Sequence, residues 1–275
     1  MRIAVIDLGT NTCNLLVAEV KEGKHETSML RCNARVYDNN FRQHGSSIRQ
    51  LKNKLFTYEI LYQGKEGVKL GKGGIHKNML TPEAFQRAEM ALKKHLEVIC
   101  RFQAAKVKII ATSAVRDAAN QSDFESYLSK ISGLNLTIIS GEEEAGLIFK
   151  GVKLAFGQIP PHSLILDIGG GSNEFILPAE NGIAWKKSFP LGMARIIEQF
   201  HISDPIKPEE ADAIENYFSK ELTGLWNQLE GKPIDRLIGC SGAFDTLADL
   251  LDETAPGTKF RITQDIHLID FERIS

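Results

Sequence analysis

A strand–turn–strand pattern with an aspartate shortly before a glycine turn occurs twice in this 275-residue chain. The first copy, IAVIDLGTNTCNLLVAEV, begins at Ile3, and the second, SLILDIGGGSNEFIL, begins at Ser163. Short apolar runs that end at glycine favour buried strands over helices. The sequence therefore predicts two hairpins of similar design, each of which delivers a carboxylate, Asp7 or Asp167, to its turn.

Both turns have the composition of an anion-binding loop. Glycine lets backbone N–H groups converge on an anion, because no side chain blocks the approach and positive φ costs little. Thr10, Asn11, Ser172 and Asn173 add short polar groups that can reach phosphate oxygens. A carboxylate beside a phosphate would repel it, so a bridging Mg²⁺, or Mn²⁺ in its place, is expected. Two ordinary tight hairpins without a ligand remain the alternative at this point.

Other nucleotide-binding patterns do not fit the chain. The Walker pattern requires Gly-Lys-Ser/Thr after a spaced glycine, and the nearest stretch, GKGGI at 71–75, lacks the hydroxyl residue. The dinucleotide pattern G-x-G-x-x-G is absent from both turns, each of which leads into a strand rather than a helix. The sequence thus argues against a Walker-type NTPase and a nucleotide-dependent dehydrogenase.

Composition indicates a soluble, cytoplasmic protein. The net charge of −2 gives no general argument for binding nucleic acid. Cys13, Cys32, Cys100 and Cys240 lack the paired spacing of a zinc site or a secreted disulfide framework, so we expect reduced thiols. The chain also has no apolar run of about 18 residues, the length that a membrane span needs. We expect neither nucleic acid nor a membrane as a partner.

Apolar runs of strand character alternate with helical patterns along the chain. Thr81 and Pro82 mark the start of a helix, a second helix is predicted near 122–131, and three glutamates open a third at GEEEA. A long amphipathic helix is predicted from Pro208 to Leu229. This alternation predicts an α/β fold, and the repeated turn predicts two domains.

Residues 24–54 do not follow the pattern. They carry seven Lys or Arg against two acidic residues and show no sustained hydrophobic period. Long loops without regular structure are uncommon inside compact domains and are usually functional or disordered. We therefore expect a disordered or irregular basic excursion, with a loop that attracts polyanions as the alternative.

Six segments in order resemble the exopolyphosphatase and guanosine pentaphosphate phosphatase family: VIDLGTNTCNLLV, ATSAVRDAAN, ISGEEEA, LDIGGGSNEF, SFPLGMARI and IGCSGAFDTLADL. The resemblance spans most of residues 1–250. It implies two similar domains of the actin-like ATPase (ribonuclease H-like) fold, which sugar kinases and heat-shock chaperone ATPases share, with the active site in the interdomain cleft. We expect these domains at 1–141 and 142–275.

The resemblance also implies roles for particular residues. Glu144, the last glutamate of GEEEA, matches the family's catalytic base, and Glu174 matches a second functional glutamate. Asp7 and Asp167 match carboxylates that bind the metal, and Arg116 matches an arginine that contacts phosphate. The remaining matches belong to loops that bind substrate phosphate: Gly9, Thr10, Asn11, Gly169, Gly170, Gly171, Ser172, Ser241 and Gly242. Ser241 also has a simpler interpretation, as the cap of the helix that follows it.

The implied activity is Mg²⁺-dependent hydrolysis of a terminal phosphoanhydride, in inorganic polyphosphate, guanosine pentaphosphate or both. Such hydrolysis needs a positioned water, neutralised phosphate charge and a base that works near neutral pH. Carboxylates crowded together have raised pKa values, which moves one of them toward that range. An ATP-dependent kinase or ATPase of the same fold is one alternative. A non-catalytic regulator that binds polyphosphate or an alarmone is another.

Two departures from the family pattern bear on these expectations. Gly146 stands where relatives commonly carry arginine after this glutamate motif, so one basic contact or salt bridge is expected to be missing. Relatives also usually continue beyond the point that corresponds to Ser275, so domain II is expected to lack a C-terminal segment. The resemblance allows a homodimer.

Overall fold

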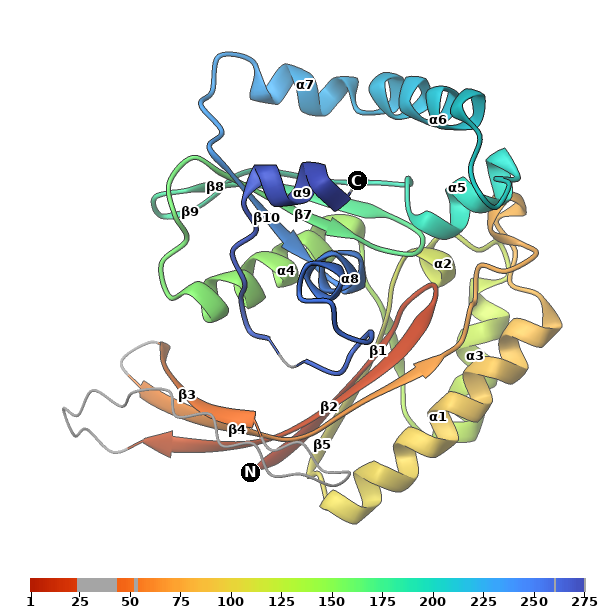
Figure 1. Cartoon of the computed structure of the whole chain (residues 1–275). Helices are drawn as coiled ribbons and strands as arrows, with labels where there is room; N and C mark the ends of the chain where they lie inside the picture. The colour runs from red at the N-terminus through yellow and green to blue at the C-terminus, as the bar shows by residue number, and fades with distance from the viewer. Residues whose placement is uncertain (24–43, 52–53, 260, 275) are drawn as a thin grey trace. The chain divides into compact units, whose positions relative to one another are not determined.

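The computed structural model describes residues 1–23, 44–51, 54–259 and 261–274 (Figure 1). It divides into two compact units, unit 1 at Met1–Ile139 and unit 2 at Ser140–Ser275. Each unit has its own β-sheet with helices packed against it, which confirms the predicted α/β class. None of the described helices has the length and apolar character that a membrane span requires.

The described part of unit 1 contains a sheet with the strand order β3-β4-β2-β1-β5-β6. β1 pairs with β2 in antiparallel fashion, as predicted for the first hairpin, and with β5 in parallel fashion. The strand bounds are β1 (Arg2–Leu8), β2 (Thr12–Gly23), β3 (His44–Leu51), β4 (Lys54–Gly67), β5 (Lys106–Ala111) and β6 (Leu136–Ile138).

Two longer helices cover the unit 1 sheet. α1 (Pro82–Phe102) begins where the sequence predicts, because the Thr81 side chain accepts a hydrogen bond from the Ala84 amide at 3.3 Å. α3 (Gln121–Ser132) packs on α1 through Phe124 and Phe85, whose ring centroids lie 4.9 Å apart. The short helix α2 (Ser113–Arg116) lies between α1 and α3 in the sequence. The 3₁₀ turn η1 (Ile75–Lys77) precedes α1.

Unit 2 repeats the central arrangement of unit 1. Its sheet has the order β10-β7-β8-β9, with β7 antiparallel to β8 and parallel to β10. The series β4-β2-β1-β5 of unit 1 therefore corresponds to β9-β8-β7-β10, which confirms the predicted second hairpin. The strand bounds are β7 (Ser163–Ile168), β8 (Asn173–Ala179), β9 (Gly182–Phe189) and β10 (Arg236–Cys240).

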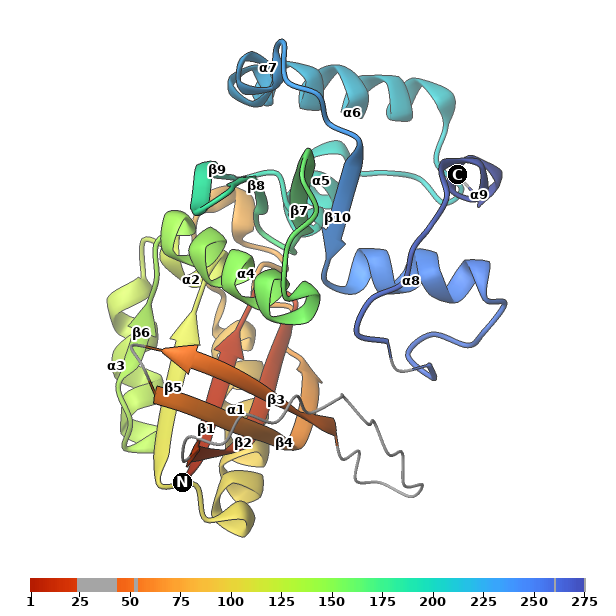
Figure 2. The same cartoon turned by 90° about the vertical axis from the view of Figure 1, so that its left-hand side faces the viewer.

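Helices cover both faces of the unit 2 sheet (Figure 2). α4 packs through Phe149 on Ile165 and Ile176 on one face, and the other face packs through Phe175 on Leu225. Burial of these apolar side chains is the main source of stability for the unit. The helix bounds are α4 (Gly141–Phe156), α5 (Met193–Phe200), α6 (Pro208–Glu221), α7 (Thr223–Leu229), α8 (Gly242–Leu251) and α9 (Leu268–Ile274).

The expected irregular excursion at 24–54 was partly wrong. Residues 24–43 and 52–53 lie outside the described residues, whereas 44–51 form β3 and residue 54 begins β4. β3 pairs in antiparallel fashion with β4, for example Leu51 with Lys54. Its sequence, HGSSIRQL, lacks alternating apolar residues, so the strand follows from pairing with β4 rather than from a local pattern.

The predicted single helix from Pro208 to Leu229 is two helices, α6 and α7, which was not expected. Leu222 ends the first and begins the second with φ −87° and ψ 10°. The Thr223 hydroxyl donates to the Lys220 carbonyl at 2.6 Å, a local bond that competes with the helical pattern. The amphipathic period continues across this break, so periodicity alone did not reveal it.

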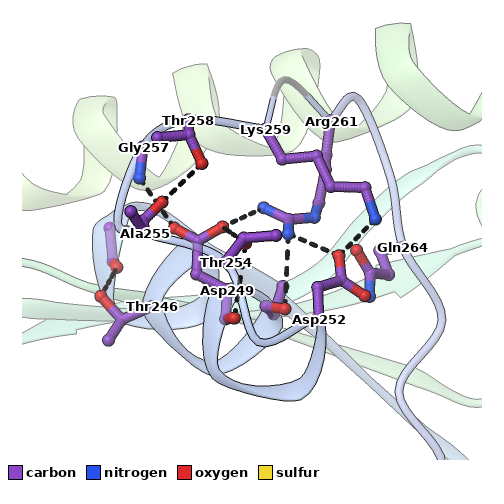
Figure 3. Close-up of polar contacts among 12 residues, drawn as sticks. Thr246, Asp249, Asp252, Thr254, Ala255, Gly257, Thr258, Lys259, Arg261 and Gln264 are labelled. Carbon is purple, nitrogen blue, oxygen red and sulfur yellow. Dashed lines mark hydrogen bonds and ion pairs between the residues drawn. The ribbon is translucent and has the colours of Figure 1, made fainter.

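An ion-pair network holds the segment after α8 against that helix (Figure 3). The Arg261 guanidinium lies between the carboxylates of Asp249 and Asp252, and its side chain is only 9% exposed. The Gly257 amide also donates to Asp249 Oδ2 at 2.8 Å. Hydrogen bonds from Lys259 and Arg261 lower the pKa of Asp252 to about 2. The segment is thus bound mainly by charged groups.

Candidate active site

In unit 1, the predicted site begins with Asp7 at the end of β1. Asn14 lies opposite it on β2, and Asn14 Nδ2 donates to Asp7 Oδ2 at 3.2 Å. Asp7 is exposed, yet the protein packed around its carboxylate raises its pKa, and the bond from Asn14 opposes this shift. An anionic carboxylate in such surroundings would gain from a nearby cation.

The turn after Asp7 is fixed by the segment that follows β4. Gly9 N donates to the Thr12 carbonyl at 2.9 Å, which closes the turn. Leu70 N donates to the Thr10 carbonyl at 2.6 Å, and Val68 N donates to the Asn11 carbonyl at 2.9 Å. The Thr10 residue is buried, whereas Gly9 and Asn11 are partly exposed. These contacts preorganise the loop to which the sequence assigns phosphate.

Arg116 lies at the same edge of the unit 1 sheet as Asp7. β1 and β5 are parallel neighbours with Leu8 opposite Ala111, so the turn after β1 and α2 after β5 start from one edge. Arg116 Nη1 donates to the Ile139 carbonyl at 3.3 Å, and its side chain is 19% exposed. Unit 1 therefore brings a carboxylate and a guanidinium to one edge.

In unit 2, polar side chains form a row across three strands. Asp167 on β7 is the cross-strand partner of Glu174 on β8, which is in turn the partner of Ser188 on β9. Ser188 Oγ donates to Glu174 Oε1 at 2.6 Å. Residues opposite one another on neighbouring strands share one face of a sheet. The face that carries this row is the one covered by α4, whose first turn contains Glu144.

The Glu174 carboxyl group, in the middle of this row, has a strongly raised pKa. Burial is the largest cause and the Glu144 carboxylate the next, and together with Asp167 they raise the pKa of Glu174 to about 7. Hydrogen bonds from Ser188 and Ser172 act in the opposite direction. A carboxyl group with this pKa exchanges its proton at neutral pH, as acid–base catalysis requires.

The glycine loop between β7 and β8 is held by the start of α5. Met193 N donates to the Gly169 carbonyl at 3.1 Å, and Ala194 N donates to the Gly170 carbonyl at 2.7 Å. Arg195 Nε donates to the Gly171 carbonyl at 2.8 Å. In a trans peptide the carbonyl and the following N–H point in opposite directions. The N–H groups that follow these carbonyls therefore point away from the start of α5.

Substitution of Gly192 by alanine is expected to disturb this loop. The added Cβ would lie 2.4 Å from backbone atoms of Gly171, closer than van der Waals contact allows. We expect a loss of about 1–3 kcal/mol in the free energy of unfolding, measured by urea denaturation. Gly151→Ala in α4 is the control, because nothing lies within 4 Å of its added Cβ. Equal stability of the two variants would contradict this role of Gly192.

Ser241 occupies the N-cap position of α8, but its side chain makes no capping hydrogen bond, in contrast to one interpretation of the sequence. The residue has φ 68° and ψ −176°, and its hydroxyl donates to the Ile168 carbonyl at 2.9 Å. It thus joins the start of α8 and the exposed Gly242 to the end of β7. Beside it, burial and the Asp167 charge raise the pKa of the Cys240 thiol to about 12, which makes that thiol unreactive.

Sequence reasoning missed three residues of the candidate site: Asn14, Ser188 and Arg195. One signal for Asn14 was present. In each hairpin the aspartate is paired with the residue seven positions later, Asn14 (14 − 7) or Glu174 (174 − 167). Aligning the two copies on their aspartates would have drawn attention to Asn14. Ser188 and Arg195 depend on strand register and on packing of α5, which no spacing reveals.

Comparisons with known proteins identify the family. The model of the Ppx/GppA phosphatase family matches residues 47–272. The crystal structure of an exopolyphosphatase from Cytophaga hutchinsonii is 33% identical, with a TM-score of 0.80, over 100% of this chain and 78% of that chain. This likeness confirms the predicted actin-like ATPase fold.

Two relatives differ in how much of their length is matched. The bifunctional 3-dehydroquinate synthase/phosphatase of Fusobacterium nucleatum is 34% identical over 206 residues, which are 74% of this chain and 27% of that protein. Exopolyphosphatase 2 of Mycobacterium tuberculosis is 26% identical over 254 residues, 90% of this chain and 70% of that protein. The chain thus spans about a quarter of the bifunctional relative. It belongs to the Ppx/GppA phosphatase family, as its motifs suggested.

Proposed function

We propose that this protein is a metal-dependent phosphohydrolase that releases terminal orthophosphate from inorganic polyphosphate. The observation that carries the proposal is the carboxyl cluster of unit 2, in which the pKa of Glu174 is raised to about 7 beside Glu144 and Asp167. The neighbouring glycine loop supports an anionic substrate. The names of the relatives support polyphosphate as that substrate.

The two glutamates would have different protonation states. Glu144 raises the pKa of Glu174 through its negative charge, so Glu174 is partly protonated near neutral pH. We assign the ionised state to Glu144, which accepts a proton from the attacking water. The water oxygen bonds to the terminal phosphorus, and the bridging P–O bond breaks. Orthophosphate and a polyphosphate shorter by one unit are the products, and the proton on Glu144 returns to solvent.

The donor set fits Mg²⁺ or Mn²⁺ held partly by substrate. In the described part of the chain, no group of three or more His, Cys, Asp or Glu side chains could hold a metal by itself. Mg²⁺ commonly uses one or two carboxylates together with waters and substrate phosphates. We assign to Asp7 in unit 1, and separately to Asp167 in unit 2, the role of such a carboxylate, each acting together with waters and substrate phosphates. The ion would neutralise phosphate charge during hydrolysis.

Removal of divalent metal tests the proposal. Orthophosphate release from long-chain polyphosphate should fall at least about 100-fold in EDTA and return when Mg²⁺ or Mn²⁺ is added in excess. Guanosine pentaphosphate is assayed beside it, because it carries a terminal phosphoanhydride of the same kind. ADP formation from ATP with an acceptor would replace the proposal with a kinase. Tight polyphosphate binding without release under any metal would favour a regulator.

A further inference from the structure

Lys186 on β9 contacts the first turn of α4. Its Nζ donates to the main-chain carbonyl of Glu142 at 2.6 Å and lies 3.8 Å from Glu142 Oε2. The Lys186 side chain is 28% exposed, so most of its length is packed against protein. Gly146, one turn further along α4, leaves room for it, because a Cβ there would lie 3.3 Å from Nζ.

A second residue of β9, Ser188, contacts the buried Glu174 of β8. Lys186 is the cross-strand partner of Ile176, and Ser188 is the partner of Glu174, so both face the side of the sheet on which α4 packs. Ser188 fixes the Glu174 carboxylate directly at 2.6 Å. Lys186 contacts the helix turn that contains Glu144, through the Glu142 carbonyl. Side chains of β9 thus contact both the Glu174 carboxylate and the helix turn that carries Glu144.

The contact of Lys186 with α4 is more than an attraction between opposite charges. The three glutamates in the first turn of α4 attract a cation, whereas the partial positive charge of the helix N-terminus opposes it. The contact to the Glu142 carbonyl is short and charge-assisted, and it depends on the backbone rather than on the Glu142 side chain. Such a bond restricts the position of the helix turn relative to the strand.

We propose that Lys186 is a positioning residue that sets the separation between Glu144 and Glu174 by fixing the first turn of α4 against β9. This inference rests on the proposed phosphatase function of the two glutamates. The proposed effect depends on the position of the hydrogen bond from Lys186 Nζ to the Glu142 carbonyl. A displacement of about 1 Å between reacting groups can lower turnover 100-fold, even though folding is unaffected.

The neighbouring lysine provides a matched control. Lys187 lies on the opposite face of β9, with Nζ 4.8 Å from the centroid of the Phe189 ring. Lys186→Met and Lys187→Met therefore remove the same charge one residue apart, but only the first removes a contact to α4. Lys186→Arg keeps a donor and tests whether a cation of different shape restores function.

We would measure kcat and KM for orthophosphate release from long-chain polyphosphate, together with hydrogen exchange of the amides at 142–147. Lys186→Met should lower kcat about 10- to 100-fold with KM changed less than about 2-fold. Lys186→Arg should recover most of the loss, and Lys187→Met should leave kcat unchanged. Exchange at 142–147 should increase in Lys186→Met alone.

Equal loss of kcat in the two methionine variants would overturn the proposal, since it would indicate a general charge effect. Unchanged exchange at 142–147 in Lys186→Met would overturn it as well. Gly146→Ala is a second variant that keeps the lysine but crowds its Nζ, and a smaller loss of kcat is expected. If the unmodified protein releases no phosphate, the proposed function fails, whereas exchange still decides whether Lys186 fixes α4.

Discussion

Substitution of Glu144 by glutamine is expected to reduce orthophosphate release from long-chain polyphosphate by about 10²- to 10⁴-fold, the usual contribution of a positioned general base. Glutamine has nearly the same size but cannot accept a proton from the attacking water. Because proton transfer occurs only in the transition state, kcat falls while KM changes little. Steady-state kinetics with Mg²⁺ present measure both constants.

Glu180→Gln is the control for this variant, because Glu180 is exposed on the turn between β8 and β9. It removes one carboxylate from the same unit without touching the cluster. We expect Glu180→Gln to retain full activity. Release by Glu144→Gln at the rate of this control would exclude Glu144 as the base.

Substitution of Glu174 by glutamine is expected to stabilise unit 2 at alkaline pH. Burial and neighbouring carboxylates raise the pKa of Glu174 from its usual 4.5 to about 7. Between these values the folded state binds the proton more tightly than the unfolded state, so stability falls as pH rises. Above about pH 7 the full penalty, about 3 kcal/mol, is present, and below the unfolded pKa it disappears.

Urea denaturation of Glu174→Gln at pH 8 and near pH 4, in EDTA, measures this difference. Both tryptophans, Trp185 and Trp226, belong to unit 2, so their fluorescence reports its unfolding. Glutamine can still accept the hydrogen bond from Ser188. A stability gain of equal size at both pH values would show that it does not arise from titration of Glu174.

The elements predicted correctly have local signals. The two hairpins follow from apolar runs around glycine turns, and the start of α1 follows from Thr81 and Pro82. β3 has no such signal, because it depends on pairing with β4. The break at Leu222 was missed because the amphipathic period continues across it, although the bond from Thr223 to the Lys220 carbonyl is local. Turns and helix starts can be predicted from neighbouring residues, whereas pairing between strands that are distant in the sequence cannot.

The candidate site shows the same division. Asp167 and Glu174 could be chosen from their motif, but their alignment with Ser188 requires the register of three strands. The sequence predicted a missing basic contact at Gly146. In the structure the space beside Gly146 holds the Nζ of Lys186, which comes from a strand 40 positions away (186 − 146). The absence of a basic side chain at Gly146 and the presence of Lys186 on β9 can be related only from the three-dimensional structure.

The network around Arg261 has a consequence for temperature. The segment after α8 is held mainly by ion pairs to Asp249 and Asp252, so its release exposes little apolar surface. A small exposed apolar area means a small heat-capacity change. The free energy that holds this segment should therefore change nearly linearly with temperature, without the strong curvature expected for the apolar core beneath α4.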